Sequence, residues 1–202
     1  MSSSTPFDTT RTAVVTMEMQ RGICGDLASF PALRAAVSGD VATNAAELLR
    51  AARARKMAVV HCTFSLRPDR AGTRLDLPLM SAARKNPDYL LQGSPATELL
   101  PELQQHRDDI VCDRHHGIAP FTNTSLHAII QDLNIDTLIV AGVSLNVGVP
   151  GLVIEAVNLG YSVTVARDAV AGFPAEYAES VVTNTLSAIA QIDSTQGIIS
   201  RL

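Results

Sequence analysis

Short apolar runs alternate with longer amphipathic stretches along most of the chain. Nearly continuous runs of Val, Ile and Ala suit parallel strands that are covered on both faces, and their alternation with helical stretches is typical of βαβ units. The pattern therefore predicts an α/β fold built on a mainly parallel sheet. The predicted strands are AVVTM (13–17), MAVVHC (57–62), DIVCD (109–113), DTLIVAG (136–142), YSVTVA (161–166) and a short terminal strand within IDSTQGII (192–199).

Three stretches carry apolar residues at helical spacing, which predicts helices that bury one face against the sheet. Asp40 is the expected cap of the first helix, and Pro174 the expected start of the last. Gly160 should end a helix that begins near Asn146. The three apolar stripes are Val41, Ala45, Leu48, Leu49 and Ala52; Leu126, Ile129, Ile130 and Leu133; and Ala178, Val181, Val182, Leu186 and Ile189.

Residues 64–95, FSLRPDRAGTRLDLPLMSAARKNPDYLLQGSP, show no regular period and contain many turn residues. A loop of this length in a compact domain is usually a lid, a binding excursion or a subunit contact. Its apolar residues would need cover in a monomer, which predicts self-association through part of this excursion or a neighbouring helix. These residues are Leu75, Leu77, Leu79, Met80, Tyr89, Leu90 and Leu91.

Composition indicates one globular domain over residues 1–202, with 1–11 as a flexible N-terminal tail. The chain has 202 residues, of which 47% are hydrophobic and 18% charged, so it can bury a sizeable core. The net charge of -4 and the scattered Lys and Arg residues argue against a nucleic-acid partner. Cys24, Cys62 and Cys112 show neither disulfide nor metal spacing. With no signal or membrane-spanning stretch, we expect a cytoplasmic protein.

Polar residues gather where the predicted strands end. In an open parallel sheet, ligands bind beyond the carboxyl ends of the strands. This rule places four groups around one crevice: Glu18, His61-Cys62, Arg114-His115-His116 and the Ser144–Gly148 turn. No GxGxxG follows the first strand and no GxxxxGK[ST] occurs, so a dinucleotide or P-loop site is not indicated.

Four segments together resemble the isochorismatase-like hydrolases, also called cysteine hydrolases. AVVTMEMQRG is similar to the family's first strand with its acid and Met-Gln, and VVHCTF to its second strand. RHHGIAPFTNTSLHAII resembles a basic residue followed by a Phe-x-x-Thr-x-Leu signature that includes Phe121. TLIVAGVSLNVGVPGLVIEAVNLGYSVTVARDAVAG resembles the longest family motif, which runs from a strand through the nucleophile turn to Asp-Ala.

The resemblance implies a three-layer α/β/α sandwich with a six-stranded, mainly parallel, Rossmann-like sheet, assembled as a homodimer or homotetramer. It also implies a catalytic Asp, Lys and Cys, whose positions here hold Glu18, Arg114 and Gly148. Without a thiol at 148, amide hydrolysis through a thioester has no nucleophile at that place. The isochorismatases proper are similar in carrying glycine there and hydrolyse a vinyl ether.

The departures leave several interpretations open. Arg114 could form a two-pronged pair with Glu18, which favours a charged carboxylate rather than a general acid, or the two could be only a structural ion pair. Gly148 could be a packing glycine at a helix start. Cys62 could be a small core residue instead of a replacement nucleophile. Of the tandem histidines, His115 and His116, only one can easily face the crevice.

A carbonyl- or carboxylate-binding cradle is expected from the N–H groups of Ser144 and Gly148, with a non-proline cis peptide at Val143-Ser144 implied by the resemblance. The expected function is thiol-independent hydrolysis of a small carboxylate- or amide-bearing metabolite; the alternative is a non-catalytic small-ligand-binding protein. Some family members bind zinc through Asp-x-His near the second strand, which TFSLRPDRAG lacks, so neither metal nor cofactor is expected. The expected substrate-binding residues are Ser144, Asn146, His61, Cys62, His115 and Phe121.

Overall fold

A six-stranded sheet forms the centre of the protein, seen in a computed structural model that describes residues 5–202. The strand order is β3-β2-β1-β4-β5-β6, and every neighbouring pair is parallel. This arrangement confirms the predicted α/β/α class and Rossmann-like sheet. The strands are β1 Thr12–Met17, β2 Ala58–Phe64, β3 Ile110–Arg114, β4 Thr137–Val143, β5 Ser162–Ala171 and β6 Gln191–Asp193.

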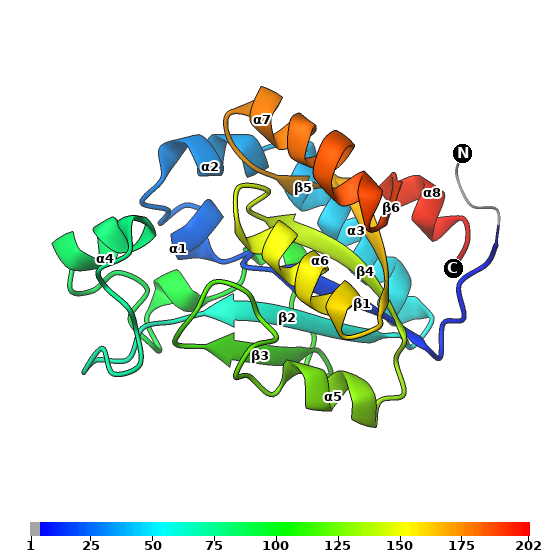
Figure 1. Ribbon diagram of the computed structural model, residues 1–202, viewed down its shortest axis with the longest axis horizontal. Helices are drawn as coiled ribbons and strands as arrows, with labels where there is room; N and C mark the ends of the chain where they lie inside the picture. The colour runs from blue at the N-terminus through cyan, green and yellow to red at the C-terminus, as the bar shows by residue number, and fades with distance from the viewer. Residues whose placement is uncertain (1–4) are drawn as a thin grey trace.

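Helices cover both faces of the sheet (Figure 1). The longest, α3, packs with α2 and α8 in one hydrophobic layer, and α5, α6 and α7 pack in the other. The α-helices are α1 Arg21–Cys24, α2 Pro31–Val37, α3 Asp40–Ala54, α4 Ser81–Lys85, α5 Leu126–Asp132, α6 Gly148–Asn158, α7 Ala175–Ser180 and α8 Thr195–Ile199. Short 3-10 helices are η1 Pro78–Met80, η2 Pro95–Thr97, η3 Pro101–Leu103 and η5 Leu186–Ala188, and η4 Val181–Thr185 is a π-helical turn.

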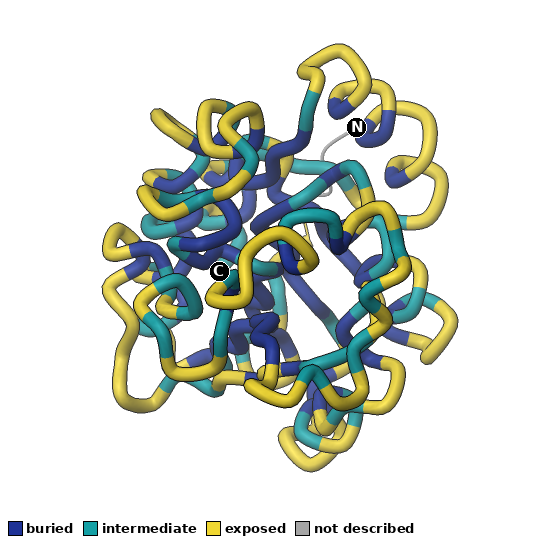
Figure 2. Tube along the Cα trace, turned by 90° about the vertical axis from the view of Figure 1, so that its left-hand side faces the viewer, coloured by how far each residue is buried: buried dark blue, intermediate teal, exposed yellow. Residues whose placement is uncertain are grey.

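The sheet is the most deeply buried part of the molecule, as the dark blue segments of Figure 2 show. All six residues of β1 are buried, and β2 and β4 have only their first residue partly exposed. Strands flanked on both sides and covered on both faces must be apolar throughout, which explains why these runs lack the alternation of a half-exposed strand.

The chain changes direction between β1 and β4, the two central strands. From β1 it moves outward through β2 and β3, and it then returns to β4 and moves outward the other way. Crevices at such a switch point are the usual ligand sites of open α/β sheets. Gly142 lets β4 approach closely there, because a Cβ at this residue would lie 2.3 Å from the Met17 carbonyl oxygen.

Three helix and strand predictions differ in detail from the structure. Gly39 occupies the N-cap of α3, and Asp40 is its first residue, where a carboxylate favours the helix dipole. The helix after Pro174 passes into a π-helical turn and a 3-10 turn, which leaves Ile189 exposed. Only Gln191–Asp193 of the terminal segment forms a strand, since Ser194 caps a helix through the Gly197 N–H.

The N-terminal segment is anchored where it is described. Residues 1–4 of the predicted tail lie outside the described residues. The Phe7 N–H donates to the Arg201 carbonyl at 2.9 Å, and the Arg201 guanidinium lies 4.4 Å from the centre of the Phe7 ring. Arg11 forms an ion pair with Asp136 at 2.6 Å. Phe7 and Arg11 thus make long-range contacts, and the flexibility of the tail stays a prediction.

Candidate active site

Glu18, Arg114 and the 144–148 turn meet in one cavity at the carboxyl ends of the central strands. Glu18 follows β1, Arg114 ends β3, and the turn connects β4 to α6. All three groups line a cavity of about 120 Å³. The predicted meeting of Glu18 and Arg114 with Gly148 is confirmed by this geometry. Their catalytic roles stay a prediction.

The backbone at Glu18 is in the left-handed region, with φ at 51°. Such a conformation is unusual outside glycine and persists only where surrounding contacts impose it. Two backbone hydrogen bonds of 2.8 Å do so, from the Glu18 N–H to the Cys62 carbonyl and from the Gln20 N–H to the Glu18 carbonyl. The carboxylate is thereby directed into the cavity instead of continuing the line of β1.

Gln20 holds the bend at Glu18 in place. No motif in the sequence indicates this role. Its fully buried side chain accepts from the Phe64 N–H at 2.8 Å and donates to the carbonyls of Phe64 and Thr97 at 3.0 and 2.9 Å. The amide thus joins the end of β1 to β2 and to η2 through three hydrogen bonds. A glutamine within the apolar stretch TMEMQ was the signal that could have identified it.

Arg114 is buried and almost fully engaged. Its Nη1 donates to the Thr63 carbonyl at 3.2 Å, and its Nη2 donates to the Ile118 carbonyl at 2.8 Å and to Glu18 Oε1. The guanidinium also lies 5.1 Å from the centre of the Phe64 ring. The two-pronged pair with Glu18 is not formed, because Nη1 is directed to a backbone carbonyl instead of the second carboxylate oxygen.

Gly148 faces the second oxygen of Glu18. An ideal Cβ at residue 148 would lie 3.5 Å from Glu18 Oε2 and only 3.1 Å from both Met17 Cε and the Val143 carbonyl oxygen. A side chain here would be tight against Met17 and the Val143 carbonyl, and its Cβ would be in ordinary contact with the carboxylate. Glycine therefore leaves Oε2 facing open space at the start of α6.

The 144–148 turn offers backbone donors to the cavity. The peptide bond between Val143 and Ser144 is cis, as the resemblance implied. Among residues 5–202, the N–H groups of Ser144, Asn146 and Gly148 donate to no protein acceptor, and all three residues line the cavity. Free N–H groups at a helix start suit a carbonyl oxygen or an oxyanion. The Asn146 side chain is not free, since it bonds the Phe173 carbonyl and N–H.

The walls around these polar groups are apolar. This surface suits a ligand with an apolar body and few polar atoms. The exposed rim residues are Leu79, Ile118 and Val147, and the deeper apolar residues are Ile23, Phe30, Leu33, Phe64, Met80, Leu90 and Phe173, with Tyr89 beside them.

Two expected binding residues of β2, His61 and Cys62, lie in the core away from the cavity. His61 Nδ1 is 2.7 Å from Thr16 Oγ1, and its Nε2 is 3.3 Å from Asp109 Oδ2. Burial lowers the pKa of His61, a shift that Asp109 partly opposes. Cys62 packs among the residues beneath α5 and α6, and burial raises its thiol pKa well above the ordinary range. Neither side chain lines the cavity, so the structure does not bring them together with Glu18 and Arg114, and their contact with a ligand stays a prediction.

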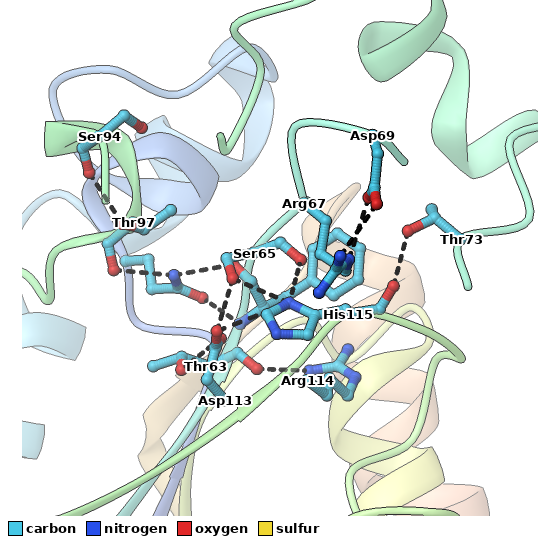
Figure 3. Close-up of polar contacts among 12 residues, drawn as sticks. Thr63, Ser65, Arg67, Asp69, Thr73, Ser94, Thr97, Asp113, Arg114 and His115 are labelled. Carbon is cyan, nitrogen blue, oxygen red and sulfur yellow. Dashed lines mark hydrogen bonds and ion pairs between the residues drawn. The ribbon is translucent and has the colours of Figure 1, made fainter. Parts of the chain in front are cut away.

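His115 and Phe121 are also directed elsewhere. Figure 3 shows Thr63 and Ser65 joined to the Asp113 carboxylate, with His115 beside them and Arg114 pointing a different way. His115 Nδ1 lies 3.1 Å from the Ser65 carbonyl oxygen. Side chains alternate along a strand, so the residues next to Arg114 turn from its cavity. Phe121 is buried and stacks on Tyr161 at 5.8 Å between ring centres.

The site can thus combine a fixed ion pair, a free carboxylate oxygen and free backbone donors. Among residues 5–202, no three His, Cys, Asp or Glu side chains are grouped so that they could hold a metal ion. The three cysteines are buried, and burial raises the pKa of Cys24 to about 12. A neutral thiol is a weak nucleophile.

Comparison with known proteins gives consistent matches over nearly the whole chain. The family described as the Isochorismatase domain matches residues 12–196. An uncharacterized isochorismatase family protein of Bacillus subtilis is 25% identical over 205 residues, which cover 100% of both chains. An isochorismatase family protein from Burkholderia thailandensis has a TM-score of 0.80 and 26% identity, with 98% of this chain and 99% of that chain covered. A cysteine hydrolase from Pseudomonas syringae has a TM-score of 0.81 and 25% identity, with 100% and 98% covered.

Proposed function

The chain belongs to the isochorismatase family, and from this premise we propose that it hydrolyses a small amide- or carboxylate-bearing metabolite without using a thiol. One observation carries the proposal. Glu18 Oε1 accepts from Arg114, whereas Oε2 faces the space above Gly148, where a side chain would otherwise begin. A carboxylate oxygen at this place can act on a water molecule or directly on the substrate.

The geometry favours a base over an acid at Glu18. A guanidinium partner pairs with the charged carboxylate, which can accept a proton, whereas a general acid must already hold one. Vinyl-ether cleavage that begins with protonation of carbon is therefore less well supported than hydrolysis of a carbonyl compound. Gly148 is consistent with this chemistry because no nucleophilic side chain is needed there.

Each step of the proposed reaction uses groups of the cavity. Glu18 Oε2 takes a proton from water, and the resulting hydroxide adds to the substrate carbonyl carbon. The N–H groups of Ser144 and Gly148 receive the negative charge on the oxygen. When the tetrahedral intermediate collapses, the bond to the leaving nitrogen or oxygen breaks and the proton on Glu18 passes to that atom. The apolar walls surround the reacting atoms while Arg114 holds Oε1 in place.

The test compares removal of the carboxylate with removal of every thiol. Hydrolysis of a panel of amides and of p-nitrophenyl esters is measured for wild type, Glu18→Ala and the triple variant Cys24→Ala, Cys62→Ala, Cys112→Ala. The triple variant should keep its activity below its melting temperature. Glu18→Ala should lose roughly a hundredfold or more, the usual contribution of a general base.

Glu176→Ala, which removes an exposed carboxylate at the start of α7, is the matched control. A folded triple variant that has lost turnover would show that the reaction requires a thiol. If a ligand binds and is always recovered unchanged, the protein is a non-catalytic binding protein on the same scaffold.

A further inference from the structure

Tyr89 brings a phenol into the cavity from the long excursion between β2 and β3. It follows α4 in the chain and lines the same cavity as Glu18 and the 144–148 turn. Its side chain is half-buried and packs against the core beneath α3. In the sequence, Tyr89 stands out only as one of the apolar residues of the 64–95 excursion, and the proposed hydrolysis does not use it.

The Tyr89 hydroxyl is unpaired in the described part of the chain. No hydrogen bond among residues 5–202 involves this oxygen. A half-buried tyrosine leaves such a hydroxyl available to water or to a ligand. The unpaired side-chain atoms sealed from solvent in residues 5–202 are Arg70 Nη1, Ser94 Oγ and Arg114 Nε. Tyr89 Oη is not one of them, so it must reach open space.

Tyr89 lines the cavity together with Glu18, so a hydroxyl that reaches open space there can meet a bound ligand. Burial raises the pKa of Tyr89 to about 12, and the negative charge of Glu18 adds to the effect. The hydroxyl therefore stays protonated at neutral pH, so that it is a hydrogen-bond donor whenever a ligand is present.

The remaining polar side chains of the cavity have defined tasks. Arg114 is held by Glu18 and two carbonyls, and Asn146 is held by Phe173. Glu18 Oε2 and the hydroxyl of Ser144 belong to the end where the substrate carbonyl would react. The charges of Glu18 and Arg114 cancel, and no other charged residue lines this cavity. Of the two ligand classes in the proposed function, the cavity thus favours the uncharged amide over the charged carboxylate.

We propose that Tyr89 is a ligand-binding residue whose hydroxyl donates to an acceptor atom of an uncharged ligand, separate from the carbonyl received by the 144–148 turn. The position of that carbonyl rests on the proposed function; the role of Tyr89 as a donor rests on its own unpaired hydroxyl. The cavity would then select ligands that carry a second hydrogen-bond acceptor on an otherwise apolar body.

The experiment uses ligands that differ by one ring atom. Binding of benzamide and of the three isomeric pyridinecarboxamides is measured by calorimetry on wild type, Tyr89→Phe and Tyr177→Phe. Each pyridinecarboxamide replaces one ring C–H of benzamide by an acceptor nitrogen. Tyr177 is an exposed tyrosine of α7 that does not line the cavity, so its replacement by phenylalanine is the matched control.

Wild type and Tyr177→Phe should bind at least one pyridinecarboxamide about three- to tenfold more tightly than benzamide, the range of one neutral hydrogen bond. Tyr89→Phe should remove this preference while its affinity for benzamide stays within about twofold. The proposal is overturned if wild type shows no such preference, including the case in which none of the four binds. It is also overturned if the preference persists in folded Tyr89→Phe.

This readout is independent of turnover. A protein that shows the Tyr89-dependent preference but hydrolyses nothing would contradict the proposed hydrolase function and leave the role of Tyr89 intact. Conversely, hydrolysis that depends on Glu18 without the binding preference would contradict the role of Tyr89 alone.

Discussion

At the residue scale, the substitutions at positions 18 and 148 are spatially coupled. Glutamate reaches one carbon further than aspartate, and glycine provides the space into which Oε2 faces. Sequence alone treats the two as separate departures from the family pattern. The structure places a Cβ at residue 148 only 3.5 Å from Glu18 Oε2, so the two positions are direct neighbours in space.

The pairing of Glu18 with Arg114 predicts how loss of the Glu18 charge changes the affinity of the cavity for anionic ligands. Glu18→Gln leaves the buried guanidinium without a carboxylate, so the cavity gains a net positive charge. We expect the ratio of benzoate to benzamide affinity to rise at least about tenfold, because the unpaired cation attracts the anionic ligand and leaves the neutral one little changed. Calorimetry below the melting temperature measures both affinities.

Glu176→Gln, at an exposed position of α7, controls for the loss of a surface charge. An unchanged affinity ratio in folded Glu18→Gln would show that Arg114 is not electrostatically accessible from the cavity. The variant should also be less stable than wild type, since a buried charge without its partner typically costs about 3–5 kcal/mol.

At the element scale, His61 helps to join the central strands to α3. Thr16 of β1 and Asp109 before β3 contact its two ring nitrogens, and Arg53 of α3 donates to Asp109 through two nitrogens at 3.1 and 2.7 Å. The backbone N–H of His106 also donates to Asp109 at 2.7 Å. This network lies apart from the cavity and has a structural role.

His61 gives the fold a pH dependence whose sign follows from burial. Its pKa is lowered in the folded protein, chiefly by burial, whereas in the unfolded chain it returns to about 6.5. The unfolded state therefore binds more protons just below pH 6.5, and stability is lost as the pH falls from 6.5 toward the folded pKa. One such group contributes up to about 1.4 kcal/mol per pH unit in this window.

Urea unfolding of wild type and His61→Gln at pH 5, 6 and 7 measures this effect. The variant should be less stable at pH 7 but should lose less of its stability on acidification. His106→Gln, at an exposed histidine, should keep the wild-type slope. Equal slopes in wild type and His61→Gln would contradict the assignment of the effect to His61.

The apolar side chains of the 64–95 excursion are more deeply buried in the monomer than the sequence predicts. Met80 and Leu90 are buried within one protomer, and Leu75, Leu77, Tyr89 and Leu91 are partly buried. Leu79 alone of the seven apolar residues stays exposed, at 47%. The excursion therefore lines the cavity, and most of its apolar surface needs no partner subunit.

At the scale of the whole molecule, self-association stays a prediction, and it now depends on fewer exposed apolar residues than the sequence indicates. Leu79 lies at the cavity rim with Ile118 and Val147, which are 36% and 37% exposed. Light scattering at micromolar concentration should give a species of about twice 21.5 kDa or larger. Leu79→Lys should weaken association, whereas Leu133→Lys, an exposed leucine after α5, should not. A single species of 21.5 kDa in wild type would contradict the prediction.

Location in the cytoplasm likewise stays a prediction. No helix in the described residues is long and apolar enough to cross a membrane.

The sequence by itself determined the sheet and the position of the site. Strand positions follow from local apolar runs, and parallel strands bring Glu18, Arg114 and the 144–148 turn to one edge wherever the connecting segments run. The family motifs added the six-stranded architecture and the cis peptide at Val143-Ser144, and the structure agrees with both.

Only the tertiary structure decided which side chains near those strand ends face the cavity. His61, Cys62, His115 and Phe121 lie near the right strand ends but turn elsewhere, whereas Tyr89 reaches the cavity from an irregular loop. Their directions depend on contacts between residues far apart in the chain, such as His61 with Thr16 and Phe121 with Tyr161. A local pattern determines which face of the sheet each strand residue points to, but long-range packing and hydrogen bonding determine the bends at the end of the strand.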